Sequence, residues 1–277
     1  MLDKIYENEH LKEKLHSLKN NIPTVIVLCG PKGVGKKHVA YNFIDEIYKG
    51  VYSSKLKSLL DIKYFEPDTK VFKLSLIDKI KESFLNTPFE LNEKYYILKN
   101  ADLMNKESAN SCLKMFEDSP SFNHFILLVE NENSLLPTIR SRSIILKVRP
   151  VTNLRKYIPE ITRIEEKIVD GCPGLLKHYA DIDLDLLYKS CYYLLNNYES
   201  LSYSEILNWF SDNINLDFAL LNNMMMMVSI DILQERSNYN PSYYYMEQGK
   251  ILKDKLRLNL NMKIHFKQAL IRVKNLL

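Results

Sequence analysis

A short glycine-rich stretch, Gly30–Lys37, holds the residues of this chain that are best suited to bind a phosphate group. It follows the pattern G-x-x-x-x-G-K, in which two glycines frame the loop and a lysine comes directly after them. Backbone N–H groups of such a loop converge on an anion, and the lysine ammonium reaches the outer phosphates. The candidate nucleotide-binding residues are Gly30, Pro31, Lys32, Gly33, Val34, Gly35, Lys36 and Lys37.

The segments on either side of this loop are those that phosphate binding requires. Residues 24–29 are β-branched or apolar, which predicts a buried strand. Apolar residues recur at helical spacing from His38 to Ile47, and Gly50 is a natural helix end. The order of strand, glycine loop and helix favours phosphate binding, although a tight turn that binds no ligand would show the same order.

The groups that would hold Mg²⁺ beside the loop are missing from their expected positions. The position after the G-K pair is normally Ser or Thr, whose hydroxyl binds the metal, and here it is Lys37. A second apolar strand, Lys94–Leu98, is followed by Lys99 and Asn100 where an acidic residue is needed, and Asp102 lies beyond them. Because a transferring phosphoryl group needs metal to stabilise its charge, we predict no magnesium site and no useful ATP hydrolysis by this chain alone.

Strands and helices continue to alternate further along the chain. Asn105 is suited to cap a helix whose apolar residues recur at spacings typical of one buried face. Phe125–Val129 and Ile144–Val148 are apolar runs typical of buried strands. Three or four such strands that alternate with helices indicate an α/β fold with a parallel, helix-covered sheet.

Composition limits the classes of protein to consider. With 277 residues, the chain exceeds one core of about 150 residues, so we expect two or three domains. No apolar run approaches the roughly 20 residues of a membrane span, and the charged N-terminus lacks the apolar core of a signal peptide. We therefore expect a cytoplasmic protein without membrane association. The net charge of +4 is too small to indicate nucleic-acid binding by itself.

The four cysteines do not form a pattern for zinc. Cys29, Cys112, Cys172 and Cys191 are far apart in the sequence, so no CxxC half-site exists. Cys29 and Cys112 fall in apolar patterns and are expected to be small buried residues. We predict no zinc.

Beyond the loop, several stretches resemble a known family. The runs NADLMNKESANSCLKMFEDSP and LLPTIRSR, together with Ser75–Glu82, are similar to bacterial clamp-loader subunits of the AAA+ class, and most similar to the delta-prime family of DNA polymerase III. LLPTIRSR matches the Ser-Arg-Cys motif of that family, with Ser141 and Arg142 kept and Ser143 in place of cysteine. The resemblance is clear over about residues 1–180.

The resemblance implies a protein of three parts. A RecA-like AAA+ P-loop domain with a degenerate P-loop would occupy residues 1–150, and a small helical lid residues 151–180. An all-α collar, residues 181–277, would join subunits into a hetero-pentamer. From their apolar spacing, we predict four helices in this last part, at Ile182–Tyr198, Tyr203–Phe210, Phe218–Gln234 and Gln248–Leu277.

The same resemblance implies a function in DNA replication. Delta-prime subunits are stationary members of the clamp loader, and the arginine of their Ser-Arg-Cys motif enters the ATP site of a neighbouring gamma or tau motor subunit. We therefore assign Arg142, with Ser141, a catalytic role in trans; an arginine supplied in this way is worth about 10³–10⁵ in rate in comparable systems. The expected partners are the motor and delta subunits and, through the complex, the sliding clamp and primer–template DNA.

One departure from the family pattern and one retained feature keep alternatives open. Residues 51–70 contain no cysteine, so the zinc module of related subunits is lost or reduced. The glycines and Lys36 are retained, which leaves open a bound ATP or ADP without turnover. The main alternative is an active P-loop ATPase of the gamma or tau type. A P-loop kinase would leave LLPTIRSR unexplained, and a direct DNA-binding module lacks an evident platform of aromatic and basic residues.

Overall fold

The structure, a computed structural model, describes residue 2 and residues 5–67, 71–213, 215–236, 239–257 and 262–275. The chain divides into two units, of which the first comprises residues 1–159 and 169–177 and the second residues 160–168 and 178–277. The three-part division of the chain at residues 150 and 180 stays a prediction.

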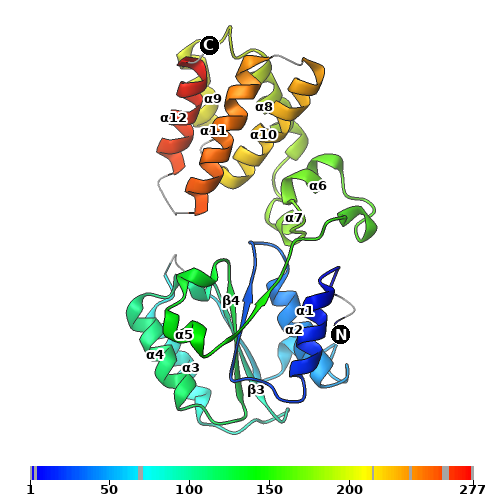
Figure 1. Ribbon diagram of the computed structural model, residues 1–277, viewed down its shortest axis with the longest axis vertical. Coiled ribbons are helices and arrows are strands. Elements are labelled where there is room, and N and C mark those ends of the chain that lie inside the picture. Colours follow the sequence, from blue (N-terminus) through cyan, green and yellow to red (C-terminus); the bar gives the residue numbers. More distant parts are fainter. Residues whose placement is uncertain are drawn as a thin grey trace. The chain divides into compact units, whose positions relative to one another are not determined.

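Five parallel strands form the sheet of the first unit, in the order β2-β3-β4-β1-β5 (Figure 1). The strands are β1 (Val25–Cys29), β2 (Ile62–Phe65), β3 (Lys94–Lys99), β4 (Asn123–Val129) and β5 (Ile144–Lys147). Because all strands are parallel, their carboxyl ends gather at one edge of the sheet, where α/β proteins bind ligands. The predicted α/β fold with a parallel sheet is confirmed.

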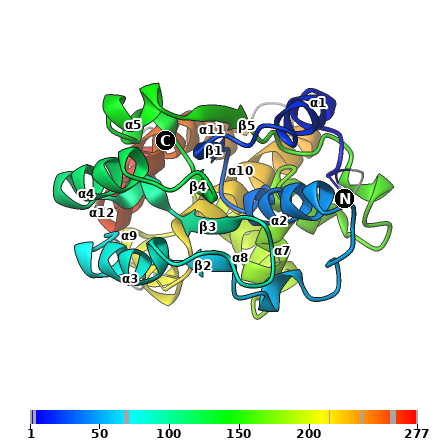
Figure 2. The same cartoon turned by 90° about the horizontal axis from the view of Figure 1, so that it is seen from below.

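Helices cover both faces of this sheet (Figure 2). One face carries α1 (Glu9–Leu18) and α2 (Lys36–Ile47), and the other carries α3 (Leu74–Phe84), α4 (Lys106–Glu117) and α5 (Pro137–Ser141). Successive residues of β1 alternate between the two cores, with Ile26 and Leu28 in the first and Val25 and Val27 in the second. All five residues of β1 are buried because the strand lies in the sheet between β4 and β5.

Local sequence signals set the ends of the helices next to the site. The side chain of Asn105 accepts a hydrogen bond of 2.8 Å from the backbone N–H of Ser108, so the predicted cap of α4 is confirmed. Helix α2 begins at Lys36, two residues before the expected start, because Gly35 adopts a left-handed conformation, with φ of +99°, directly before it.

Short elements connect these strands and helices. Single turns of 3₁₀ helix lie at Leu56–Ser58, Ala101–Leu103, Glu132–Ser134 and Leu154–Lys156. Two further helices, α6 (Arg163–Val169) and α7 (Gly174–His178), fall in the region where the sequence indicated a lid.

The second unit contains the remaining helices. They are α8 (Leu184–Asn196), α9 (Tyr203–Asp212), α10 (Phe218–Glu235), α11 (Asn240–Arg257) and α12 (Met262–Asn275). The prediction of one helix over Gln248–Leu277 is wrong, because α11 and α12 are separate helices that pack against each other; residues 258–261 and 276–277 lie outside the described residues. Within the described ranges, no helix is long and apolar enough to cross a membrane.

Candidate functional site

The glycine-rich loop lies between β1 and α2, at the carboxyl edge of the sheet. Gly33 has a φ of +76°, a conformation that favours glycine. A side chain on Gly30 would come within 2.3 Å of the carbonyl oxygen of Val148, so only glycine fits there. Of the other predicted residues, Val34 is buried, whereas Pro31 and Lys32 are exposed.

Lys36 turns its ammonium group into its own loop. Its Nζ donates hydrogen bonds to the carbonyl oxygens of Gly30, at 2.6 Å, and Pro31, at 3.0 Å. Burial lowers the pKa of Lys36, while the charges of Glu130 and Asp102 act in the opposite direction. An incoming phosphate group must therefore compete with two carbonyl oxygens for this ammonium.

Two carboxylates near Lys36, those of Asp102 and Glu130, were not predicted from the sequence to belong to this site. Asp102 lies in the 3₁₀ turn after β3, and its Oδ2 accepts backbone hydrogen bonds from Glu130, at 3.0 Å, and Asn131, at 3.4 Å. Glu130 directly follows β4. The only available signal was their position just after apolar strands, because strand ends converge at one edge of a parallel sheet.

Both lysines that replace expected Mg²⁺ ligands interact with residues at the end of β2. The ammonium of Lys37 lies over the ring of Tyr64, 3.5 Å from its centroid. Lys99 forms an ion pair with Glu66, whose other carboxylate oxygen accepts a hydrogen bond of 3.3 Å from the hydroxyl of Tyr64. Burial lowers the pKa of Lys37 and the charge of Glu66 opposes this shift. Tyr64 and Glu66 thus link the two substituted positions, a connection that local sequence did not indicate.

The second glycine cluster of the sequence packs directly on the loop. The backbone N–H of Gly174 donates a hydrogen bond of 2.9 Å to the carbonyl oxygen of Gly33. A Cβ atom built on Gly33 would lie 2.6 Å from Cγ of Leu175 and 2.9 Å from its backbone nitrogen. Gly33 and Gly174 therefore allow two backbone segments to approach each other more closely than side chains would permit.

Arg142 directly follows α5 and its side chain is 48% exposed. Its Nη2 lies 2.9 Å from Oε1 of Glu117, the last residue of α4, and its Nη1 donates a hydrogen bond of 3.4 Å to the carbonyl oxygen of Thr138. The hydroxyl of Ser141 donates to the same carbonyl at 3.1 Å. The neighbouring Arg140 instead donates to Asn133 at 3.1 Å.

The structure thus places the predicted site residues in two groups. The residues Gly30–Lys37 contact β2, Val148 directly after β5, and the segment around Gly174. Ser141 and Arg142 contact residues of α4 and α5. Lys36 donates to the carbonyl oxygens of Gly30 and Pro31, whereas Arg142 contacts Glu117 and Thr138, so each group needs its own chemical explanation.

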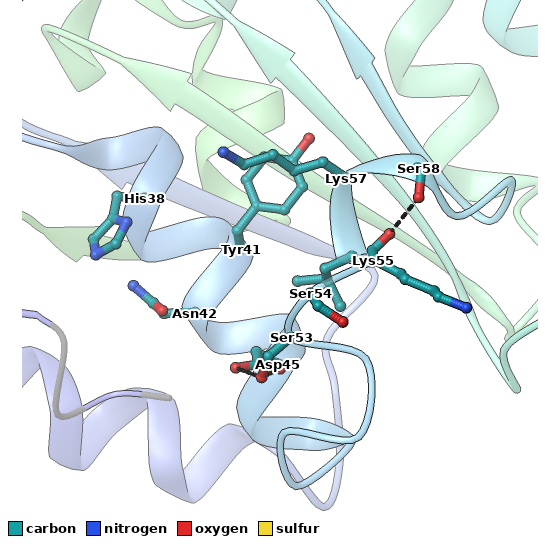
Figure 3. A pocket seen from close by; sticks show the side chains of 10 residues that line it. His38, Tyr41, Asn42, Asp45, Ser53, Ser54, Lys55, Lys57 and Ser58 are labelled. Carbon is teal, nitrogen blue, oxygen red and sulfur yellow. Dashed lines mark hydrogen bonds between the residues drawn. The ribbon is translucent and has the colours of Figure 1, made fainter.

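A pocket of about 500 Å³ lies beside α2 (Figure 3). One wall is formed by residues of α2, including His38 and Tyr41, and the other by residues 53–58. The hydroxyl of Ser53 donates to both carboxylate oxygens of Asp45, at 2.7 and 2.8 Å. None of its lining residues is a predicted site residue.

No cluster that could hold a metal ion is found where the chain is described, counting groups of three or more His, Cys, Asp or Glu side chains. All four cysteines have free, buried thiols, which confirms the expectation for Cys29 and Cys112. Burial raises the pKa of Cys112 to about 12.

Comparisons with known proteins provide an independent view of the first unit. The sequence profile of the family described as DNA polymerase III, delta subunit, matches residues 7–152, more than half of the chain. The chain is 34% identical to DNA polymerase III subunit delta' of Bacillus subtilis (strain 168) over 91 residues, which are 33% of this chain and 28% of that protein.

A second relative and one solved structure extend this comparison. The chain is 25% identical to the replication factor C small subunit of Aeropyrum pernix over 180 residues, 61% of this chain and 53% of that protein. It therefore spans between 28% and 53% of the length of these two relatives. The crystal structure of a DNA polymerase III gamma subunit-related protein from Thermotoga maritima aligns over 96% of this chain and 98% of that chain, with a TM-score of 0.55 and 18% identity, a likeness of fold.

Proposed function

The chain belongs to the family of the DNA polymerase III delta subunit, and from this membership we propose that it is a clamp-loader subunit that completes the ATP site of a neighbour without hydrolysing ATP itself. The resemblance to delta-prime clamp-loader subunits is confirmed. The proposed partners are gamma or tau motor subunits and a delta subunit in a hetero-pentamer, with the sliding clamp and primer–template DNA bound through the complex in the cytoplasm.

The observation that carries the proposal is that lysines occupy both positions where Mg²⁺ ligands are expected, and that each lysine has a partner within the chain. Lys37 stacks on Tyr64 and Lys99 pairs with Glu66, so two positive charges and their partners lie where metal ligands are required. A lysine ammonium offers no acceptor to a cation. Without metal at the phosphates, hydrolysis loses its main electrostatic stabilisation, which supports a subunit that holds ATP or ADP without turnover.

Arg142 supports the second part of the proposal. Its guanidinium is about half exposed, in contrast to the ammonium of Lys36, and it lies next to the short helix α5. A permanently charged, exposed arginine can enter the site of another subunit and stabilise the charge of the transition state.

The test is the Arg142→Ala variant in the complex reconstituted with its motor and delta subunits. We expect single-turnover hydrolysis at the ATP site that Arg142 completes to fall by about 10³-fold, the lower end of the range for arginines supplied in trans. Size-exclusion chromatography should show unchanged assembly. A fully assembled variant complex that hydrolyses ATP at the normal rate would disprove the role of Arg142.

A second candidate function is an active ATPase of the gamma or tau type, and the carboxylates near Lys36 favour it. Asp102 and Glu130 both act on the charge of Lys36 and are tied together by a backbone hydrogen bond. Mg²⁺-dependent ATP turnover by the isolated chain that is abolished in Asp102→Asn and Glu130→Gln would support this candidate. Turnover indistinguishable from a chain-free control would exclude it.

A further inference from the structure

Glu117, at the carboxyl end of α4, forms the one ion pair that Arg142 makes within the described residues. We propose that Glu117 is a positioning residue for Arg142: together with the carbonyl oxygen of Thr138, it holds the guanidinium in the orientation in which its remaining N–H groups face the ATP of the neighbouring subunit. This inference rests on the proposed function of Arg142.

The donor geometry of Arg142 leaves room for both roles. A guanidinium carries five N–H donors in a planar arrangement. The carbonyl oxygen of Thr138 accepts a hydrogen bond of 3.4 Å from Nη1, and the carboxylate of Glu117 forms an ion pair of 2.9 Å with Nη2, so two of the five donor groups are engaged. Three donors remain, enough for the paired hydrogen bonds by which arginine binds phosphate oxygens. The contact with Glu117 therefore orients the guanidinium and leaves donors for the phosphate oxygens.

The backbone around Arg142 is already fixed by local hydrogen bonds. Its N–H donates to the carbonyl oxygen of Ile139 at 3.2 Å, and the hydroxyl of Ser143 donates to the same carbonyl at 2.6 Å. The side chain, however, has several rotatable bonds beyond this anchored backbone. Glu117 acts on this remaining freedom from a different helix, α4, which packs beside α5.

A contribution to folding stability is not a sufficient explanation for the ion pair between Glu117 and Arg142. Glu117 and Arg142 are 50% and 48% exposed, and exposed ion pairs add little to folding stability. A preorganised catalytic group, in contrast, avoids the entropy cost of ordering it during the reaction. We therefore expect the loss of Glu117 to affect the rate of the complex more than the folding of the chain.

The experiment compares variants in the reconstituted complex. Glu117→Ala should lower kcat for ATP hydrolysis at the completed site by about threefold to tenfold, the effect of leaving one flexible side chain unordered, with KM for ATP unchanged. Glu117→Asp, which keeps the charge, should recover part of the loss. Asp118→Asn is the matched control, because it removes the same charge from the next residue, which forms no ion pair in the described part of the chain.

A double variant separates positioning from a structural role. In the Arg142→Ala background, Glu117→Ala should cause no further loss, since there is no guanidinium to orient. A further loss in that background, or a normal or raised kcat for Glu117→Ala in a complex that needs Arg142, would overturn the inference. Failure of the proposed function gives a different result, because Arg142→Ala itself would then leave hydrolysis unchanged.

Discussion

The two candidate regions of this molecule, the glycine-rich loop and the turn around Arg142, use their positive charges in opposite ways. Lys36 donates to the carbonyl oxygens of its own loop, and burial lowers its pKa. Arg142 remains about half exposed and engages one carboxylate at the surface. Both cations have partners within the chain, but the ammonium of Lys36 is turned into its own loop, whereas Arg142 is about half exposed and can also reach an outside partner.

Under the proposed function, this contrast means that a retained motif and a working site are different things. The loop keeps every residue of the G-x-x-x-x-G-K pattern, yet Lys36, Lys37 and Lys99 all have partners within the chain. The turn lacks the cysteine of its family motif and still presents its arginine outward. Function in this chain is therefore better judged from the partners of each charge than from the completeness of a motif.

The packing of the loop against Gly174 offers the largest expected effect on stability. Gly33→Ala adds a Cβ that would lie 2.6–2.9 Å from Leu175, in a left-handed conformation. We expect a loss of about 2–3 kcal/mol in the free energy of unfolding, measured by urea titration.

Gly35→Ala is the matched control for this prediction. Gly35 is also left-handed, but a Cβ there would meet nothing within 4 Å. Its cost should reflect backbone strain alone, about 1–2 kcal/mol. Equal losses in the two variants would mean that the loop is not closed by the segment around Leu175, and the contrast between the two regions would weaken.

The buried ammonium of Lys36 predicts a pH dependence. The pKa of Lys36 is lower in the folded protein than its ordinary value of 10.5, so the unfolded chain binds more protons between these two values. The stability of the wild type relative to Lys36→Met should therefore rise as the pH increases through this window. Unfolding titrations of both proteins from neutral pH to pH 10.5 measure this difference, because all other titrating groups are common to both.

A flat or falling difference between the wild type and Lys36→Met would contradict this prediction. It would mean that solvent reaches the ammonium of Lys36, and that the loop presents its charge outward as the turn around Arg142 does.

The smallest expected effect concerns Glu66. Glu66→Gln removes the ion pair with Lys99, and both side chains are 40% or more exposed. We expect a loss of less than about 1 kcal/mol in the free energy of unfolding, and a smaller loss at high salt, because exposed pairs are screened. Glu132→Gln, which breaks another surface pair with Lys147, provides the control. A loss well above that of the control would show that Glu66 and the two lysines form a rigid support of the site.

Local sequence was sufficient to predict most elements of the first unit. The apolar run of β1 and the helix cap at Asn105 are local patterns. The strand and the start of α4 can therefore be predicted from a few neighbouring residues, without tertiary structure. The one long helix expected at the C-terminal end was wrong, because apolar spacing alone does not show where α11 ends and α12 begins. The two helices pack against each other, a contact that spacing along the sequence does not reveal.

The partners of the site residues could not be deduced in this way. Nothing in the sequence around Glu66 or Glu117 indicates their partners, and they reach Lys99 and Arg142 only because the sheet and helices bring distant segments together. The same holds for the approach of Asp102 and Glu130 to Lys36. The types of residue at a site can thus be predicted from the sequence, whereas the partners of the charged side chains depend on long-range contacts.

The hydrogen bond between Gly33 and Gly174 has a consequence for how the protein is made. Gly174 leaves the ribosome roughly 140 residues after Gly33, which at about 5–20 residues per second corresponds to roughly 7–28 seconds. Throughout that interval the nascent loop lacks its covering segment, and β1 lacks both of its neighbouring strands until β4 and β5 emerge. C-terminal truncations that end before Gly174 should therefore leave the glycine-rich loop without its covering segment.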